Sequence, residues 1–196
     1  MSQQRDKKLF RALAAAFFGC VIGIASAGTP SEPTSFNLNS SDINEGQSLS
    51  TDQVFSGFGC TGNNISPSLS WTGAPESTKS FALTVYDPDA PTGSGWWHWV
   101  VFNIDSSTTS ISRNAGALDS KLAPQGSVQS RTDFGLKGFG GACPPEGHGR
   151  HRYQFTLHAL NVDTLQLSDD SSAALVGYMI NQHRIAKTTI EAIYER

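Results

Sequence analysis

The 196-residue sequence predicts a mostly β fold with one helix near its C-terminus. Three segments support this class. Apolar and other residues alternate along 81–86 and along 153–159, and a period of two is typical of half-buried strands. Residues 99–104 form an apolar run broken only by Asn103, which indicates a strand buried on both faces.

Four strands are expected in chain order, around 81–86, 99–104, 153–159 and 188–194. Turn-rich stretches at 105–130 and 133–150 separate them, and no internal repeat interrupts the order. The residues expected to share one face of each alternating strand are Phe81, Leu83 and Val85, then Tyr153, Phe155, Leu157 and Ala159, and finally Thr188, Ile190, Ala192 and Tyr194.

One segment, from about Ser171 to His183, has the pattern of a helix. Asp169 and Asp170 precede it, and carboxylates favour the positive N-terminal end of a helix. The apolar stripe expected to face the core consists of Ala174, Leu175, Tyr178 and Met179.

The N-terminal segment resembles a cleaved signal peptide. Four basic residues, Arg5, Lys7, Lys8 and Arg11, precede a mostly apolar run at 12–25, and Ala25-Ser26-Ala27 predicts cleavage after Ala27. The run spans only about 21 Å as a helix, which is too short to cross a membrane. An amphipathic helix, or a lipoprotein acylated at Cys20, is the alternative.

The predicted organisation is therefore a signal peptide at 1–27, a flexible N-terminus at 28–35 and a single domain at 36–196. The whole chain carries 14 basic and 17 acidic residues. Removal of residues 1–27 leaves 10 basic and 16 acidic residues, a net charge of −6. An acidic chain without a basic patch is a poor nucleic-acid binder. The signal-peptide pattern predicts that the protein is periplasmic or secreted.

Two of the three cysteines remain after cleavage. An even pair in an exported protein predicts a disulfide, Cys60–Cys143. A Cys/His metal site using Cys143, His148 and His151 is the alternative, although no second CxxC or HxxxH motif completes a ligand set.

The first candidate site is the segment 86–104, YDPDAPTGSGWWHWVVFNI. Pro88 and Pro91 restrict the backbone around two acids, Asp87 and Asp89. A carboxylate near His98 would raise the pKa of this histidine and make it cationic. The alternative is that the acids only cap the turn and that His98 is a core residue.

The second candidate site is the glycine-rich segment 138–155, GFGGACPPEGHGRHRYQF. Exposed N–H groups in such a loop can bind an anion, and His151 could add a donor. The alternative is a long hairpin loop held by the disulfide. Arg152 is expected to form a structural ion pair, and no function is assigned to His148, His158 or His183.

Together, DPDAP, GSGWWHWVVFNI and PP followed by HRY resemble the phosphatidylethanolamine-binding protein family, also called Raf kinase inhibitor-like, in its bacterial YbhB/YbcL branch. The likeness runs from about Phe36 to the C-terminus. It implies a PEBP-like β-sandwich with few peripheral helices, a small anion pocket and a cis Ala90–Pro91 bond. The binding residues that it implies are Asp87, Pro88, Asp89, His98, Pro144, Pro145, Gly147, His151 and Tyr153.

The expected function is that of an exported, non-enzymatic binding protein without cofactor or metal. Its expected ligand is a small phosphate-like or carboxylate group, including a phosphoethanolamine headgroup. One alternative is an inhibitor or signalling module that acts on a protein partner, as protease- or kinase-inhibiting relatives do. A second is a hydrolase that uses the Asp/His/His set, although no GxSxG or HExxH motif is present. The resemblance is also compatible with a homodimer.

Overall fold

The computed structural model describes residues 35–196. The predicted signal peptide at 1–27, and residues 28–34 of the predicted flexible segment, lie outside the described residues. Within 35–196, no helix is both long and apolar enough to span a bilayer.

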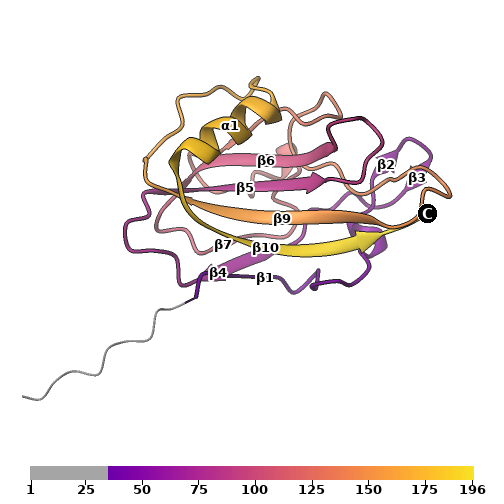
Figure 1. The fold of residues 1–196 in the computed structure, drawn as a ribbon, viewed down its shortest axis with the longest axis horizontal. Helices are drawn as coiled ribbons and strands as arrows, with labels where there is room; N and C mark the ends of the chain where they lie inside the picture. The colour runs from indigo at the N-terminus through magenta and orange to yellow at the C-terminus, as the bar shows by residue number, and fades with distance from the viewer. Residues whose placement is uncertain (1–34) are drawn as a thin grey trace, which may run out of the picture. The chain divides into compact units, whose positions relative to one another are not determined.

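A five-stranded antiparallel sheet forms the centre of the domain, in the order β10-β9-β5-β6-β8 (Figure 1). Its four long strands are the four that the sequence predicts, and this prediction is confirmed. Strand β10 begins earlier than expected, directly after the helix. The strands are β5 (Ser80–Asp87), β6 (Trp96–Asp105), β8 (Val128–Gln129), β9 (His151–Leu160) and β10 (Arg184–Tyr194).

A second, three-stranded sheet and a separate hairpin complete the β structure, which confirms the mostly β class. Alternation did not predict these elements because none has more than four residues. The three-stranded sheet contains β1 (Asn37–Asn39), β4 (Leu69–Thr72) and β7 (Ser110–Ile111). The hairpin contains β2 (Ser56–Gly57) and β3 (Cys60–Thr61), and the 3-10 helices are η1 (Thr51–Gln53) and η2 (Leu118–Ser120).

The central sheet is buried on both faces, because each face has its own apolar core. Phe81, Leu83 and Val85 on one face pack in the same core as Trp71 of β4. Ala82 on the other face belongs to the core that lies under the helix α1 (Ala173–His183). Figure 1 accordingly shows α1 on one side of the central sheet and β1 and β4 on the other.

A bulge at Asn103 interrupts the apolar run 99–104 and changes the face on which the following side chain lies. Phe102 packs under α1 whereas Ile104 packs in the opposite core, although residues two apart normally share a face. Asn103 has a positive φ of 58°, and the pairing of β5 with β6 shifts register here. Its side chain also bonds both backbone groups of Leu165, which holds the bulge in place.

The helix lies within the predicted segment, but of the predicted buried stripe only Met179 packs against the core. Ser172 caps the first turn by accepting a hydrogen bond from the amide of Leu175. The sheet covers Ala173, Val176 and Ile180, whereas Leu175 and Tyr178 are exposed. The helix is apolar on more than one side, so spacing alone did not identify the side that packs.

Candidate functional site

A small pocket lies at the end of the central sheet where β5 ends and where β6 and β9 begin, next to the β2–β3 hairpin. Its volume is about 190 Å³. Antiparallel pairing of β5 with both neighbours brings these strand ends together, although they are far apart in the sequence. The pocket is lined by Phe58, Asp87, Ala90, Pro91, Thr92, Trp96, His98, Phe134, Cys143, Pro144, Pro145, His151 and Tyr153.

Asp87 and His151 form a buried pair at the base of this pocket. Nδ1 of His151 lies 2.7 Å from Oδ2 of Asp87, and both side chains are almost fully buried. A carboxylate only accepts, so Nδ1 carries the proton of this bond. Nε2 of His151 lies 2.8 Å from Nδ1 of His148, which is on the exposed loop before β9. The hydrogen-bonded series Asp87–His151–His148 therefore runs from the interior to the surface.

The pKa of His98 is lowered rather than raised, so the expected rise is wrong. Burial lowers the pKa of His98, and this effect outweighs a hydrogen bond to Gly140 and the charge of Asp87, which both raise it. The direct partner of Asp87 is His151 rather than His98. Nδ1 of His98 donates to the carbonyl of Gly140 at 2.7 Å, which leaves Nε2 of the neutral ring as an acceptor.

Tyr153 also lines the pocket and carries a buried hydroxyl group. The residue is 1% exposed, its ring meets that of His98 in a T-shaped arrangement, and its hydroxyl has no hydrogen-bond partner within the described chain. Burial also raises its pKa, so the phenol keeps its proton. A buried hydroxyl without a partner is costly, and a ligand that supplied one would be favoured.

Three of the residues implied by the resemblance, Pro88, Asp89 and Gly147, do not line the pocket. Asp89 instead binds Arg152 through both carboxylate oxygens, and this ion pair lowers the pKa of Asp89. The amide of Gly147 donates to the carbonyl of Arg196. The expectation that Arg152 forms a structural ion pair is confirmed.

The glycine-rich loop presents few free amides. The N–H groups of Gly140 and Ala142 donate to backbone carbonyls, and that of Gly141 donates to the side chain of Asn64. The amide of His148 donates to Pro145. These groups are therefore not available for the anion-binding nest that the glycines suggested. The expected cis Ala90–Pro91 bond is also absent, since all described peptide bonds are trans.

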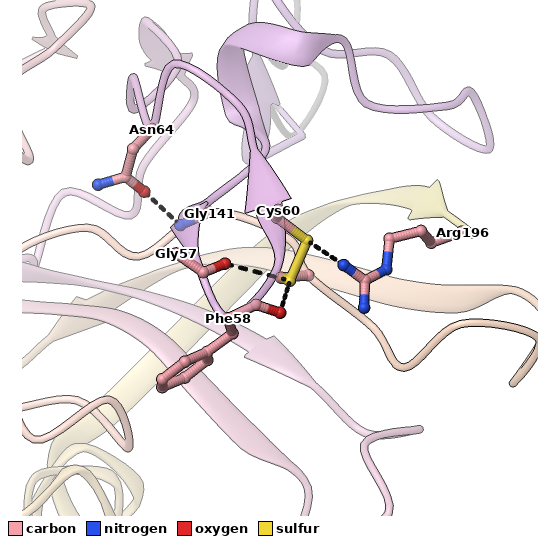
Figure 2. The surroundings of a disulfide bond; sticks show 7 residues. Gly57, Phe58, Cys60, Asn64, Gly141 and Arg196 are labelled. Atoms are coloured by element: carbon pink, nitrogen blue, oxygen red, sulfur yellow. Dashed lines mark hydrogen bonds between the residues drawn. A yellow bond between two sulfur atoms is a disulfide. The ribbon is translucent and has the colours of Figure 1, made fainter.

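The predicted disulfide between Cys60 and Cys143 is present, with an S–S distance of 2.03 Å. Figure 2 shows Arg196 beside the sulfur of Cys60, and the carbonyl oxygens of Gly57 and Phe58 beside the other sulfur of the disulfide. That second sulfur belongs to Cys143. The disulfide joins the β2–β3 hairpin to the segment that leads into Pro144. Because the Cys143 sulfur is bonded to Cys60, the alternative metal site with His148 and His151 is wrong.

Sequence reasoning missed the aromatic wall of the pocket. Phe58 has a positive φ of 51° in the hairpin turn and is 69% exposed. Its ring stacks on Phe134, which also meets Trp96 edge-on. The adjacent Gly59, also with positive φ, is the signal for a tight two-residue turn that could have placed Phe58 at a loop tip.

Comparisons with known proteins agree with this architecture. The family described as phosphatidylethanolamine-binding protein matches residues 39–195. The UPF0098 proteins YbcL and YbhB of Escherichia coli K12 are 54% and 45% identical to this chain. The matches cover 84% and 80% of this chain and 90% and 98% of the relatives. The crystal structure of E. coli YbcL matches with a TM-score of 0.81 and 55% identity, over 82% of this chain and 98% of that one.

Proposed function

The chain belongs to the phosphatidylethanolamine-binding protein family, in its YbhB/YbcL branch, and from this we propose that it is a binding protein for a small phosphate-bearing or headgroup-like ligand. The observation that carries the proposal is the buried polar wall of the pocket. His98 offers a free ring nitrogen and Tyr153 offers a hydroxyl without a partner. A small, largely apolar pocket with a few convergent polar groups is typical of a ligand site.

We further propose that the site binds without catalysing a reaction. The hydrogen-bonded series Asp87–His151–His148 ends on an exposed imidazole, whereas a catalytic triad ends on a hydroxyl or thiol nucleophile. The sulfur of Cys143 is bonded to Cys60, and the hydroxyl of Thr92 donates to the carbonyl of Gly95. Neither group at the pocket is therefore an activated nucleophile.

The proposal is tested by titrating the oxidised protein with phosphate and with phosphoethanolamine and following amide shifts by two-dimensional NMR. Saturable shifts should cluster at 87–98 and 141–153. They should weaken in His98→Ala but persist in a control variant, His183→Ala, because His183 lies at the far end of α1 and outside the pocket. No shifts at millimolar concentrations of either ligand would overturn the proposal.

Export is part of the same proposal. It is supported by the leader-like pattern at 1–27 and by the disulfide, since stable disulfides are typical of oxidising compartments. N-terminal sequencing of protein recovered from the periplasmic fraction should start at Gly28. Recovery of an uncleaved chain in the cytoplasm, or of a chain acylated at Cys20, would contradict it.

A further inference from the structure

The two sulfur atoms of the Cys60–Cys143 disulfide have different surroundings. Cys60 is buried, and Nη1 of Arg196 lies 3.2 Å from its sulfur (Figure 2). Cys143 is half-buried and lines the pocket. The carbonyl oxygens of Gly57 and Phe58 each lie 3.6 Å from the Cys143 sulfur. A cation therefore lies beside one sulfur, whereas partly negative oxygens lie beside the other.

These surroundings favour one direction of thiol–disulfide exchange. In this reaction a thiolate attacks one sulfur, and the other sulfur leaves with the electron pair of the broken bond. The guanidinium of Arg196 would stabilise a thiolate on Cys60, which makes Cys60 the better leaving group. Access favours the same direction, because Cys143 borders the pocket. Cys60 borders a separate hollow, but Arg196 lines that hollow as well.

The disulfide also ties down the tip of the β2–β3 hairpin. Each of these strands has two residues, and Phe58 and Gly59 form the turn between them. The base of the hairpin is held separately, since the amide of Phe55 donates to the carbonyl of Ala142. Without the disulfide, Phe58 would be held mainly by its ring contacts with Phe55 and Phe134. Opening of the disulfide would therefore free the tip and leave the base in place.

We propose that Cys143 is a modification site for low-molecular-weight thiols, which open the Cys60–Cys143 disulfide by exchange. The incoming thiol loses its proton to solvent, and its sulfur bonds to the sulfur of Cys143. The bond between the two cysteines breaks, and Cys60 leaves as a thiolate beside Arg196. One disulfide replaces another, so the reaction needs no further oxidant or reductant. The attached group lies at the pocket, and the freed tip loosens the side of the pocket that Phe58 forms.

The first test identifies the sulfur that takes the thiol. The folded, oxidised protein is incubated with excess reduced glutathione, and the reaction is stopped with N-ethylmaleimide, which alkylates free thiols. Peptide mass spectrometry of singly modified chains should find glutathione on Cys143 and the maleimide on Cys60. Glutathione found mainly on Cys60, equal amounts on the two cysteines, or no adduct at all would overturn the proposal.

The second test measures the contribution of Arg196 to the rate. Arg196→Gln should slow the formation of the adduct by about threefold or more, because the leaving thiolate loses its neighbouring cation. Arg150→Gln is the matched control, since it makes the same change in net charge at a largely exposed side chain that pairs with Glu195. The control should react as fast as the unmodified protein. Equal rates in all three proteins would contradict the role of Arg196.

A third measurement distinguishes exchange in the folded protein from exchange through unfolding. The rate should not change at low concentrations of urea, which would accelerate a reaction of the unfolded chain. Amide chemical shifts of the purified adduct should change at 57–60 and near Cys143, whereas β5 and β9 should keep the dispersed shifts of a folded sheet. Acceleration by urea, or loss of dispersion in the central sheet, would assign the reaction to the unfolded chain and refute the proposal.

Discussion

Nδ1 of the exposed His148 lies 2.8 Å from Nε2 of the buried His151. His148 stands between Gly147 and Gly149, which both have positive φ and open space around them. A residue on the exposed loop before β9 thus closes the outer end of the buried Asp87–His151 pair. The sequence motif GHGRHRY contains both histidines, but only their distance in space shows that one completes the hydrogen bonds of the other.

Replacement of His148 tests this relationship. His148→Ala should lower the free energy of unfolding by about 1 kcal/mol, because it removes a partner of the buried Nε2 that water replaces only in part. Arg150→Ala on the same loop is the control. Its side chain is largely exposed and lies 3.8 Å from Glu195, so the change should stay below about 0.5 kcal/mol. Equal effects in urea denaturation would contradict the assigned role of His148.

Two glycines in the turn between β5 and β6 should respond differently to alanine. At Gly95 an added Cβ would collide with the Tyr86 hydroxyl and approach the carbonyl of Asp87 to 2.7 Å. At Gly93 it would meet nothing within 4 Å, so only the positive φ of 81° is strained. Gly95→Ala should cost about 3 kcal/mol or more, and Gly93→Ala about 1 kcal/mol. Similar thermal shifts in the two variants would argue against tight packing at this turn.

Reduction of the disulfide should destabilise the domain strongly. Cys60 and Cys143 are 83 residues apart, and the chain-entropy model assigns about 4–5 kcal/mol to closing a loop of this length. Urea denaturation with and without reductant measures the difference. In the double variant Cys60→Ser/Cys143→Ser, reductant should have no effect on stability. A loss below about 1 kcal/mol in the unmodified protein would contradict the expectation.

The stability of the folded protein should decline as the pH falls below the pKa of a histidine in the unfolded chain. Burial lowers the pKa of His158 from 6.5 to about 3, so the unfolded chain binds a proton that the folded chain excludes. The contribution is complete above about pH 6.5 and is lost as the pH falls towards 3, at about 1.4 kcal/mol per unit. From about pH 7 to 5 the loss should be roughly 2 kcal/mol, and the lowered pKa of His98 acts in the same direction.

His158→Gln provides the control for this pH dependence. Glutamine can still bond Thr84, which lies 3.0 Å from Nε2 of His158, but it does not titrate. Denaturation curves of the variant should therefore show a smaller decrease between these pH values. An unchanged slope would assign the dependence to other groups.

Much of the fold could be predicted because long strands repeat their pattern often enough to be read. Strands β5, β9 and β10 alternate over many residues, and the apolar run of β6 marks a sheet covered on both sides. The three-stranded sheet could not be predicted in this way, because two or four residues do not establish a period. The buried face of α1 depended on the sheet against which it docks.

The sequence by itself indicated four polar residues of the pocket, Asp87, His98, His151 and Tyr153, through motifs visible in the printed chain, but not the aromatic wall with Phe58 and Phe134. Only the tertiary structure decided how they pair and which of them are charged. A hydrogen bond requires partners within about 3 Å, and strand register sets such distances. The balance between burial and neighbouring charge sets the pKa of His98, and burial arises only when the sheets and loops have closed around it.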